Sequence, residues 1–81
     1  MNMNDTRLIR IESVTDLGAV IRTERKRQGI SQAVAAGLCG VSVHFLSNLE
    51  RGKETSEFSR VMQVLWAMNI RLYVDVPGTG A

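Results

Sequence analysis

Residues 30–53, ISQAVAAGLCGVSVHFLSNLERGK, predict two short helices joined by a glycine turn. Ser31 and Ser42 each precede a helical run, and a serine there caps a helix by accepting from backbone N–H groups that lack an intrahelical partner. Gly40 between the two runs supplies the positive φ that a tight turn needs. We therefore expect a helix that begins after Ser31, a second helix over residues 42–50, and a basic exit loop.

The second of these helices has two chemically different faces. Leu46 and Leu49 fall three residues apart on one face. The opposite face carries Val43, His44, Ser47 and Asn48. A surface helix that is apolar inward and carries short hydrogen-bonding groups outward has the dimensions and chemistry to enter a DNA major groove. The alternative is an ordinary αα-hairpin of a small bundle, which does not require the basic exit loop.

The first helix of the pair is expected to lie close against its neighbour. Ala33, Ala36 and Leu38 supply small and medium apolar groups for that contact, and Gln32 is expected to face outward in the first turn. Cys39 sits beside the turn, where a small buried residue fits, and core packing is favoured over a redox role. One cysteine forms no internal disulfide.

The segment from Leu17 to Val74 resembles the Xre/Cro/C1-type helix-turn-helix family, and residues 47–53, SNLERGK, are its most specific piece. More narrowly, the chain is similar to HipB-like antitoxins, which are small DNA-binding proteins encoded beside a HipA-type kinase toxin. The resemblance implies a mainly α, lambda-repressor-like domain of four helices. It also implies a C-terminal β-strand that pairs with a second copy to form a dimer.

The resemblance places candidate site residues on this chain. Val43 and His44 lie where relatives carry base-reading glutamines, and His44 is alternatively an ordinary surface residue. The resemblance also implies a buried or half-buried ion pair between the positions of Arg25 and Glu50, and Arg25 is alternatively a phosphate contact. The expected base-reading residues are Val43, His44, Ser47 and Asn48, and the expected DNA phosphate contacts are Ser31, Gln32, Ser42, Arg51 and Lys53.

Two further helices complete the predicted scaffold. Ser13, with Asp16 three residues on, predicts a helix that ends at about Gln28, before Gly29. Its inward residues are expected to be Val14, Leu17, Val20 and Ile21. Thr55 or Ser56 is expected to cap a fourth helix that runs to about Met68. Its expected inward stripe is Phe58, Val61, Met62, Leu65 and Met68.

Residues 70–77 show the alternation of a strand with one buried face. Ile70, Leu72, Val74 and Val76 alternate with polar or larger residues, and Pro77 ends the run. Because a helical domain offers no partner for the N–H and C=O groups of one strand, we expect it to pair with the same strand of a second copy. The N-terminal arm is the alternative partner. The expected divisions are an arm at 1–12, a DNA-binding domain at 13–69, a strand at 70–77 and a tail at 78–81.

Composition limits the classes of function. The 81 residues carry a net charge of +2, and the basic residues gather in or beside the predicted DNA-binding unit, although Glu24 and Glu57 temper the patch. A charge run of this kind is alternatively a solvated helix face. A domain this small buries little surface, so a partner surface is useful. The absence of a long apolar run favours a cytoplasmic protein.

One histidine, one cysteine and no paired carboxylates do not assemble a nucleophile with its base or a metal site, so we expect no enzyme activity, metal or cofactor. The expected function is a sequence-specific repressor that binds an inverted-repeat operator as a dimer. We expect it to be an antitoxin that neutralises a HipA-like kinase toxin. The alternatives are a stand-alone regulator and an interaction module in which DNA binding is secondary. Trp66, Tyr73 and Phe45 are candidate anchors for a protein partner.

Overall fold

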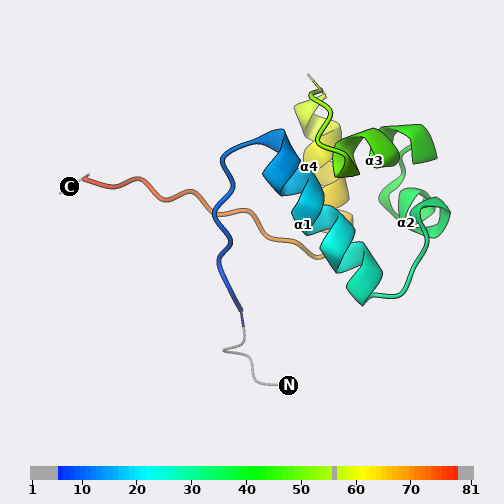
Figure 1. Ribbon diagram of the computed structural model, residues 1–81, viewed down its shortest axis with the longest axis horizontal. Helices are drawn as coiled ribbons and strands as arrows, with labels where there is room; N and C mark the ends of the chain where they lie inside the picture. Colours follow the sequence, from blue (N-terminus) through cyan, green and yellow to red (C-terminus); the bar gives the residue numbers. More distant parts are fainter. Residues whose placement is uncertain (1–5, 56, 79–81) are drawn as a thin grey trace.

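The computed structural model describes residues 6–55 and 57–78, and the helices in this part of the chain form a small mainly α domain (Figure 1). The four helices are α1 (Val14–Arg27), α2 (Gln32–Cys39), α3 (Val43–Glu50) and α4 (Phe58–Ala67). The axes of α2 and α3 are bent by 109° at the turn between them, which is within the range of a helix-turn-helix. No single helix in the described residues is long and apolar enough to cross a membrane.

Serine side chains begin the first three helices. The Oγ atoms of Ser13, Ser31 and Ser42 each accept a hydrogen bond from the backbone N–H three residues later, at 3.0–3.2 Å. Gly40 ends α2 in the left-handed conformation, with φ of 72°. These caps and this turn confirm the predicted helix-turn-helix, because the local sequence alone determines them.

The predicted cap of α4 is wrong for Thr55. Its Oγ1 accepts from Glu57 N–H at 3.0 Å, but the helix begins only at Phe58 and its N-cap residue, Glu57, makes no side-chain cap bond. Ser56, the other predicted cap, lies outside the described residues. Among the described residues, the predicted side-chain cap of α4 is therefore absent.

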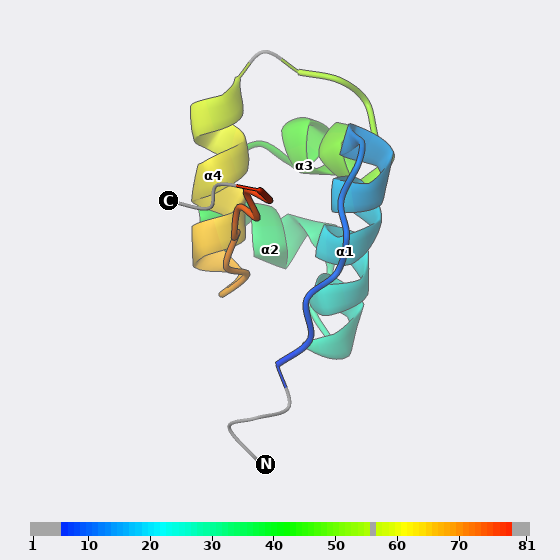
Figure 2. The same cartoon turned by 90° about the vertical axis from the view of Figure 1, so that its left-hand side faces the viewer.

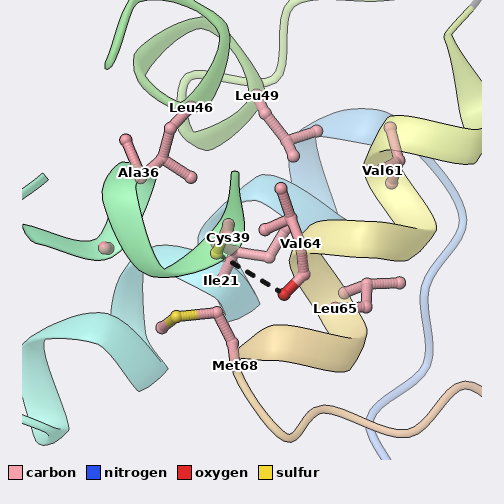
Figure 3. Close-up of a cluster of buried hydrophobic side chains, with 10 residues drawn as sticks. Ile21, Ala36, Cys39, Leu46, Leu49, Val61, Val64, Leu65 and Met68 are labelled. Carbon is pink, nitrogen blue, oxygen red and sulfur yellow. Dashed lines mark hydrogen bonds between the residues drawn. The ribbon is translucent and has the colours of Figure 1, made fainter. Parts of the chain in front are cut away.

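The hydrophobic core lies where the four helices meet (Figure 3). Its buried residues are Ile21, Ala35, Ala36, Cys39, Leu46, Leu49, Val61, Val64, Leu65 and Met68. Cys39 packs in this core as predicted, and burial raises the pKa of its thiol.

Two of the predicted inward faces were wrong in part. On α2, Ala33 and Leu38 are exposed, because Ala35, Ala36 and Cys39 form the face that meets the core. On α4, Val64 takes an inward place, while Phe58 and Met62 are exposed. On α2 the inward face is thus rotated from the prediction, with Ala36 shared between the two, whereas for α4 the predicted Val61, Leu65 and Met68 are buried.

Two glycines allow α1 to approach the end of α3. A Cβ on Gly18 would overlap the carbonyl oxygen of Leu49 and lie 2.9 Å from that of Glu50. A Cβ on Gly52, whose φ is 78°, would lie 2.7 Å from Thr15 Cα. The first half of α1 therefore lies directly against the C-terminal end of α3 and the exit loop, without an intervening side chain.

The C-terminal segment runs away from the helices (Figure 1). Ile70 is half-buried and packs against the core, but Leu72, Val74 and Val76 are exposed. No strand forms within the described residues. Figure 1 shows that the C-terminal segment extends away from α4, and Figure 2 shows that it stays apart from the N-terminal arm.

Candidate nucleic-acid interface

The outward face of α3 is open to solvent. Val43 and His44 are exposed, and Ser47 and Asn48 are half-buried. On the opposite face of the same helix, Leu46 and Leu49 are buried in the core. The structure therefore places all four predicted base-reading residues on one accessible surface of one helix.

Three side chains on this surface are joined by hydrogen bonds. Arg51 Nη2 donates to Asn48 Oδ1 at 2.7 Å. Asn48 Nδ2 lies 3.1 Å from His44 Nε2. Because the three residues are spaced four and three apart, they follow each other along one face of the helix. Arg51 is thus a side-chain partner of Asn48, a contact that the sequence did not reveal.

A buried ion pair holds α3 against α1. Arg25 Nε donates to Glu50 Oε2 at 2.7 Å and Arg25 Nη2 donates to Glu50 Oε1 at 3.0 Å. Arg25 Nη1 also donates to the carbonyl oxygen of Ile30 at 2.9 Å. The two residues are only 8% and 6% exposed. The planar guanidinium therefore links the end of α3, helix α1 and the loop before α2 in one fixed geometry.

Glu50 is a carboxylate with most of its hydrogen-bonding capacity in use. Besides Arg25, Gln32 Nε2 donates to Glu50 Oε1 at 3.0 Å. Burial alone raises the pKa of Glu50, but the hydrogen bonds from Arg25 and Gln32, with the charges of Arg25 and Arg22, outweigh it and leave the pKa below its usual value. The hydrogen bond to Glu50 likewise raises the pKa of Arg25. Both groups are therefore charged across the neutral range.

The predicted phosphate contacts surround this surface, with one correction. Gln32 was expected to face outward, but it is half-buried and turned onto Glu50, because the buried carboxylate offers it a stronger partner than solvent does. Ser31 and Ser42 are exposed caps; each hydroxyl oxygen accepts from the backbone, so its O–H remains free to donate. Arg51 and Lys53 are exposed.

Two shallow hollows flank the outer ridge of α3. One is lined by Arg22, Gln32, Ser47, Glu50 and Arg51. The other includes Ser42, His44, Asn48 and Lys53, together with residues from the exit loop and the start of α4. The first hollow brings Arg22 of α1 beside the predicted contacts, although Arg22 was not among the predicted site residues. Arg22 and Arg25 lie three residues apart on α1, yet Arg25 is buried and Arg22 is exposed. The sequence does not show this difference, because it depends on how α1 packs against the other helices.

The sequence and the fold match known helix-turn-helix proteins. Residues 16–65 match the family described as "Helix-turn-helix domain". The HTH-type transcriptional regulator y4mF of Sinorhizobium fredii is 38% identical over 69 residues, which are 85% of this chain and 91% of that protein.

Solved structures share the fold at lower identity. HipB in a complex with an O2 20mer has a TM-score of 0.77 at 20% identity, covering 88% of this chain and 99% of HipB. A HipA–HipB–O2–O3 complex gives 0.76 at 18% identity, covering 86% of this chain and 99% of the matched chain. The restriction-modification controller protein C.AhdI from Aeromonas hydrophila has a TM-score of 0.63 at 24% identity, and the match covers 72% of this chain and 84% of C.AhdI. These solved structures show that the fold is shared, and the family match together with the 38% identical relative shows that the chain belongs to the helix-turn-helix family of transcriptional regulators.

Proposed function

We propose that the protein is a sequence-specific repressor that binds an inverted-repeat operator as a homodimer and acts as the antitoxin of a type II toxin–antitoxin pair. The observation that carries the DNA-binding part is the outer face of α3, which is open while the buried Arg25–Glu50 pair holds the helix in place. A recognition helix must present its side chains in a fixed register to read base edges. The ion pair and the close approach at Gly18 supply that rigidity.

The proposed contacts divide into two classes. Val43, His44, Ser47 and Asn48 read base edges, where Val43 suits a thymine methyl and the other three offer hydrogen-bonding groups. Ser31, Ser42, Arg51 and Lys53 contact phosphates and position the domain, as does Gln32 through the second N–H of the amide that donates to Glu50. Arg22, which shares a hollow with Gln32 and Arg51, adds positive charge to the same surface.

The proposed dimer uses the C-terminal segment. Ile70 anchors this segment to the core of its own chain, while Leu72, Val74 and Val76 stay exposed. Pairing residues 70–77 with their symmetry copy satisfies the free backbone groups and covers these three apolar side chains. The dimer then presents two copies of α3 about one helical turn of DNA apart, roughly 34 Å, and such a protein recognises an inverted repeat.

The antitoxin role extends the resemblance to HipB. Likeness to the HipA–HipB–O2–O3 complex, at 18% identity, shows the fold, and the fold is compatible with a HipA-like kinase as partner. We propose that the operator lies in the protein's own promoter. We also propose that the protein acts in the cytoplasm. The experiment is fluorescence anisotropy with that promoter and with a shuffled duplex of equal length. We expect much tighter binding to the promoter, and equal binding to both duplexes contradicts the proposed repressor.

A stand-alone regulator is the second candidate. The 38% identical relative is named a transcriptional regulator and C.AhdI a controller protein, and neither name includes a toxin. Co-expression distinguishes the two functions. If the neighbouring reading frame encodes a kinase that stops growth and this chain restores growth, the antitoxin role holds. If no such kinase is present, the stand-alone role holds.

A further inference from the structure

We propose that Arg51 fixes the orientation of the Asn48 amide, so that α3 selects an adenine in each operator half-site. This inference rests on the proposed DNA-binding function and adds to it the identity of one base and the residue that imposes it. Arg51 is here a positioning residue, in contrast to the simple phosphate contact that its charge and place predict.

The first step is the chemistry of the Arg51–Asn48 bond. A guanidinium carries only donors, so the amide atom that lies 2.7 Å from Arg51 Nη2 has to be the oxygen. If the amide turned by 180°, its NH₂ group would face the guanidinium, donor against donor. Arg51 therefore distinguishes the two ends of the amide, which no hydrogen-bond partner that both donates and accepts is able to do.

The second step is the opposite end of the amide. With Oδ1 held by Arg51, Nδ2 faces His44 Nε2 at 3.1 Å and donates to it. The His44 ring then carries its proton on Nδ1. A neutral imidazole has one donor and one acceptor nitrogen, so His44 is able to bind either end of the Asn48 amide. His44 therefore supports the amide orientation that Arg51 imposes but does not impose it by itself.

The third step is what remains free on Asn48. An amide oxygen accepts two hydrogen bonds and an amide nitrogen donates two, so each end keeps one place after the bonds to Arg51 and His44. One acceptor beside one donor matches adenine, which presents N6–H₂ and N7 in the major groove. Guanine presents two acceptors there, cytosine a donor and thymine an acceptor with a methyl group. The fixed amide therefore favours adenine over the other three bases.

The experiment compares the base preferences of variants. Wild-type protein, Asn48→Ala, Arg51→Ala and the double variant are each used to select bound duplexes from a randomised pool, and affinities are then measured on duplexes that differ at one position. We expect the wild type to prefer adenine at one position per half-site, by on the order of tenfold. Asn48→Ala and Arg51→Ala should both remove this preference, and the double variant should lose no more than either alone.

Conservative variants separate positioning from charge. Arg51→Lys keeps a cation that only donates and should retain the adenine preference, whereas Arg51→Gln both donates and accepts and should lose it. Lys53→Ala, the matched control, should weaken binding to all duplexes and leave the preference unchanged. Thermal unfolding of each variant checks that these substitutions leave the fold intact.

Other outcomes overturn the proposal. If Arg51→Ala weakens binding to every duplex equally while Asn48→Ala alone removes the adenine preference, Arg51 is only a phosphate contact. If Asn48→Ala leaves the preference unchanged, Asn48 does not read adenine. A wild type that selects no sequence from the pool contradicts the proposed function itself, which distinguishes that failure from the failure of this inference.

Discussion

Arg25 and Glu50, which are 25 positions apart in the sequence, meet through two hydrogen bonds of 2.7 and 3.0 Å in a nearly solvent-free contact. This contact joins α1 to the last residue of α3, and Gln32 of α2 donates to the same carboxylate. The three helices that present the DNA-binding surface are therefore tied together at one charged group. The pair affects geometry as well as stability, because its two parallel hydrogen bonds constrain the orientation of α1 relative to the end of α3.

Removal of one partner of this pair should strongly destabilise the fold. Arg25→Ala leaves a buried, poorly hydrated carboxylate and should lower the free energy of unfolding by about 3 kcal/mol. Arg27→Ala is the matched control, since Arg27 is exposed where it pairs with Glu24, and it should lower the free energy of unfolding far less than Arg25→Ala does. Urea unfolding measures both. In a double-mutant cycle, zero coupling between Arg25→Ala and Glu50→Ala contradicts the pair.

The depressed pKa of Glu50 predicts a pH dependence with a definite sign. Between the lowered folded pKa and the ordinary glutamate value of about 4.3, the unfolded chain binds more protons than the folded chain. The contribution of Glu50 to the free energy of unfolding is therefore complete above about pH 5 and is lost as the pH falls through the pKa of Glu50 in the folded protein. Glu50→Gln should flatten the fall in the free energy of unfolding below about pH 5.

Added salt supplies the control for this measurement. The hydrogen bond from Arg27 also lowers the pKa of Glu24, but that pair is more exposed to solvent than Arg25 and Glu50 are. The pH-dependent free energy of unfolding that Glu24→Gln removes should be screened by about 1 M salt. Most of the pH-dependent free energy that Glu50→Gln removes should remain at that salt concentration. If salt abolishes both parts equally, the Arg25–Glu50 pair is not shielded from solvent.

Two glycine-to-alanine substitutions should act in opposite directions. Gly18→Ala places a methyl group against the carbonyl oxygens of Leu49 and Glu50 and should cost at least 1–3 kcal/mol through overpacking. Gly37→Ala meets nothing within 4 Å in the middle of α2 and should stabilise by up to about 1 kcal/mol, because alanine is the better helix former. Thermal unfolding compares them, and a neutral Gly18→Ala contradicts the close approach of α1 to α3.

The proposed dimer predicts a loss of self-association when its exposed strand face is charged. Val74→Asp changes a side chain that is 82% exposed, so a folded monomer is the expected product by sedimentation. Val34→Asp, at an exposed position on α2, should remain dimeric and serves as the control. Truncation after Asn69 should likewise yield a monomer or an unfolded chain. A truncated chain that is still a folded dimer places the interface elsewhere.

The sequence was sufficient for those parts of the fold that local chemistry determines. Ser31 and Gly40 determine where α2 begins and ends, and Ser42 determines where α3 begins, through interactions with their own neighbours. The rotation of α2, the contact of Gln32 with Glu50 and the bond from Arg51 to Asn48 depend on where other elements lie, and periodicity in an eight-residue helix does not fix them. Gly18 did carry a signal, since a glycine inside a helix often marks a close packing contact.

The central claim is that α3 reads sequence while Lys53 in the exit loop positions the domain. The most direct measurement is the affinity of Asn48→Ala and Lys53→Ala for the operator and for a random duplex over a range of salt concentrations. Asn48→Ala should weaken operator binding by roughly 1–3 kcal/mol with little effect on the random duplex. Lys53→Ala should weaken both alike and reduce the salt slope by about one unit. Equal losses on both duplexes for every substitution at Val43, His44, Ser47 and Asn48 would contradict the account, because α3 would then not read sequence.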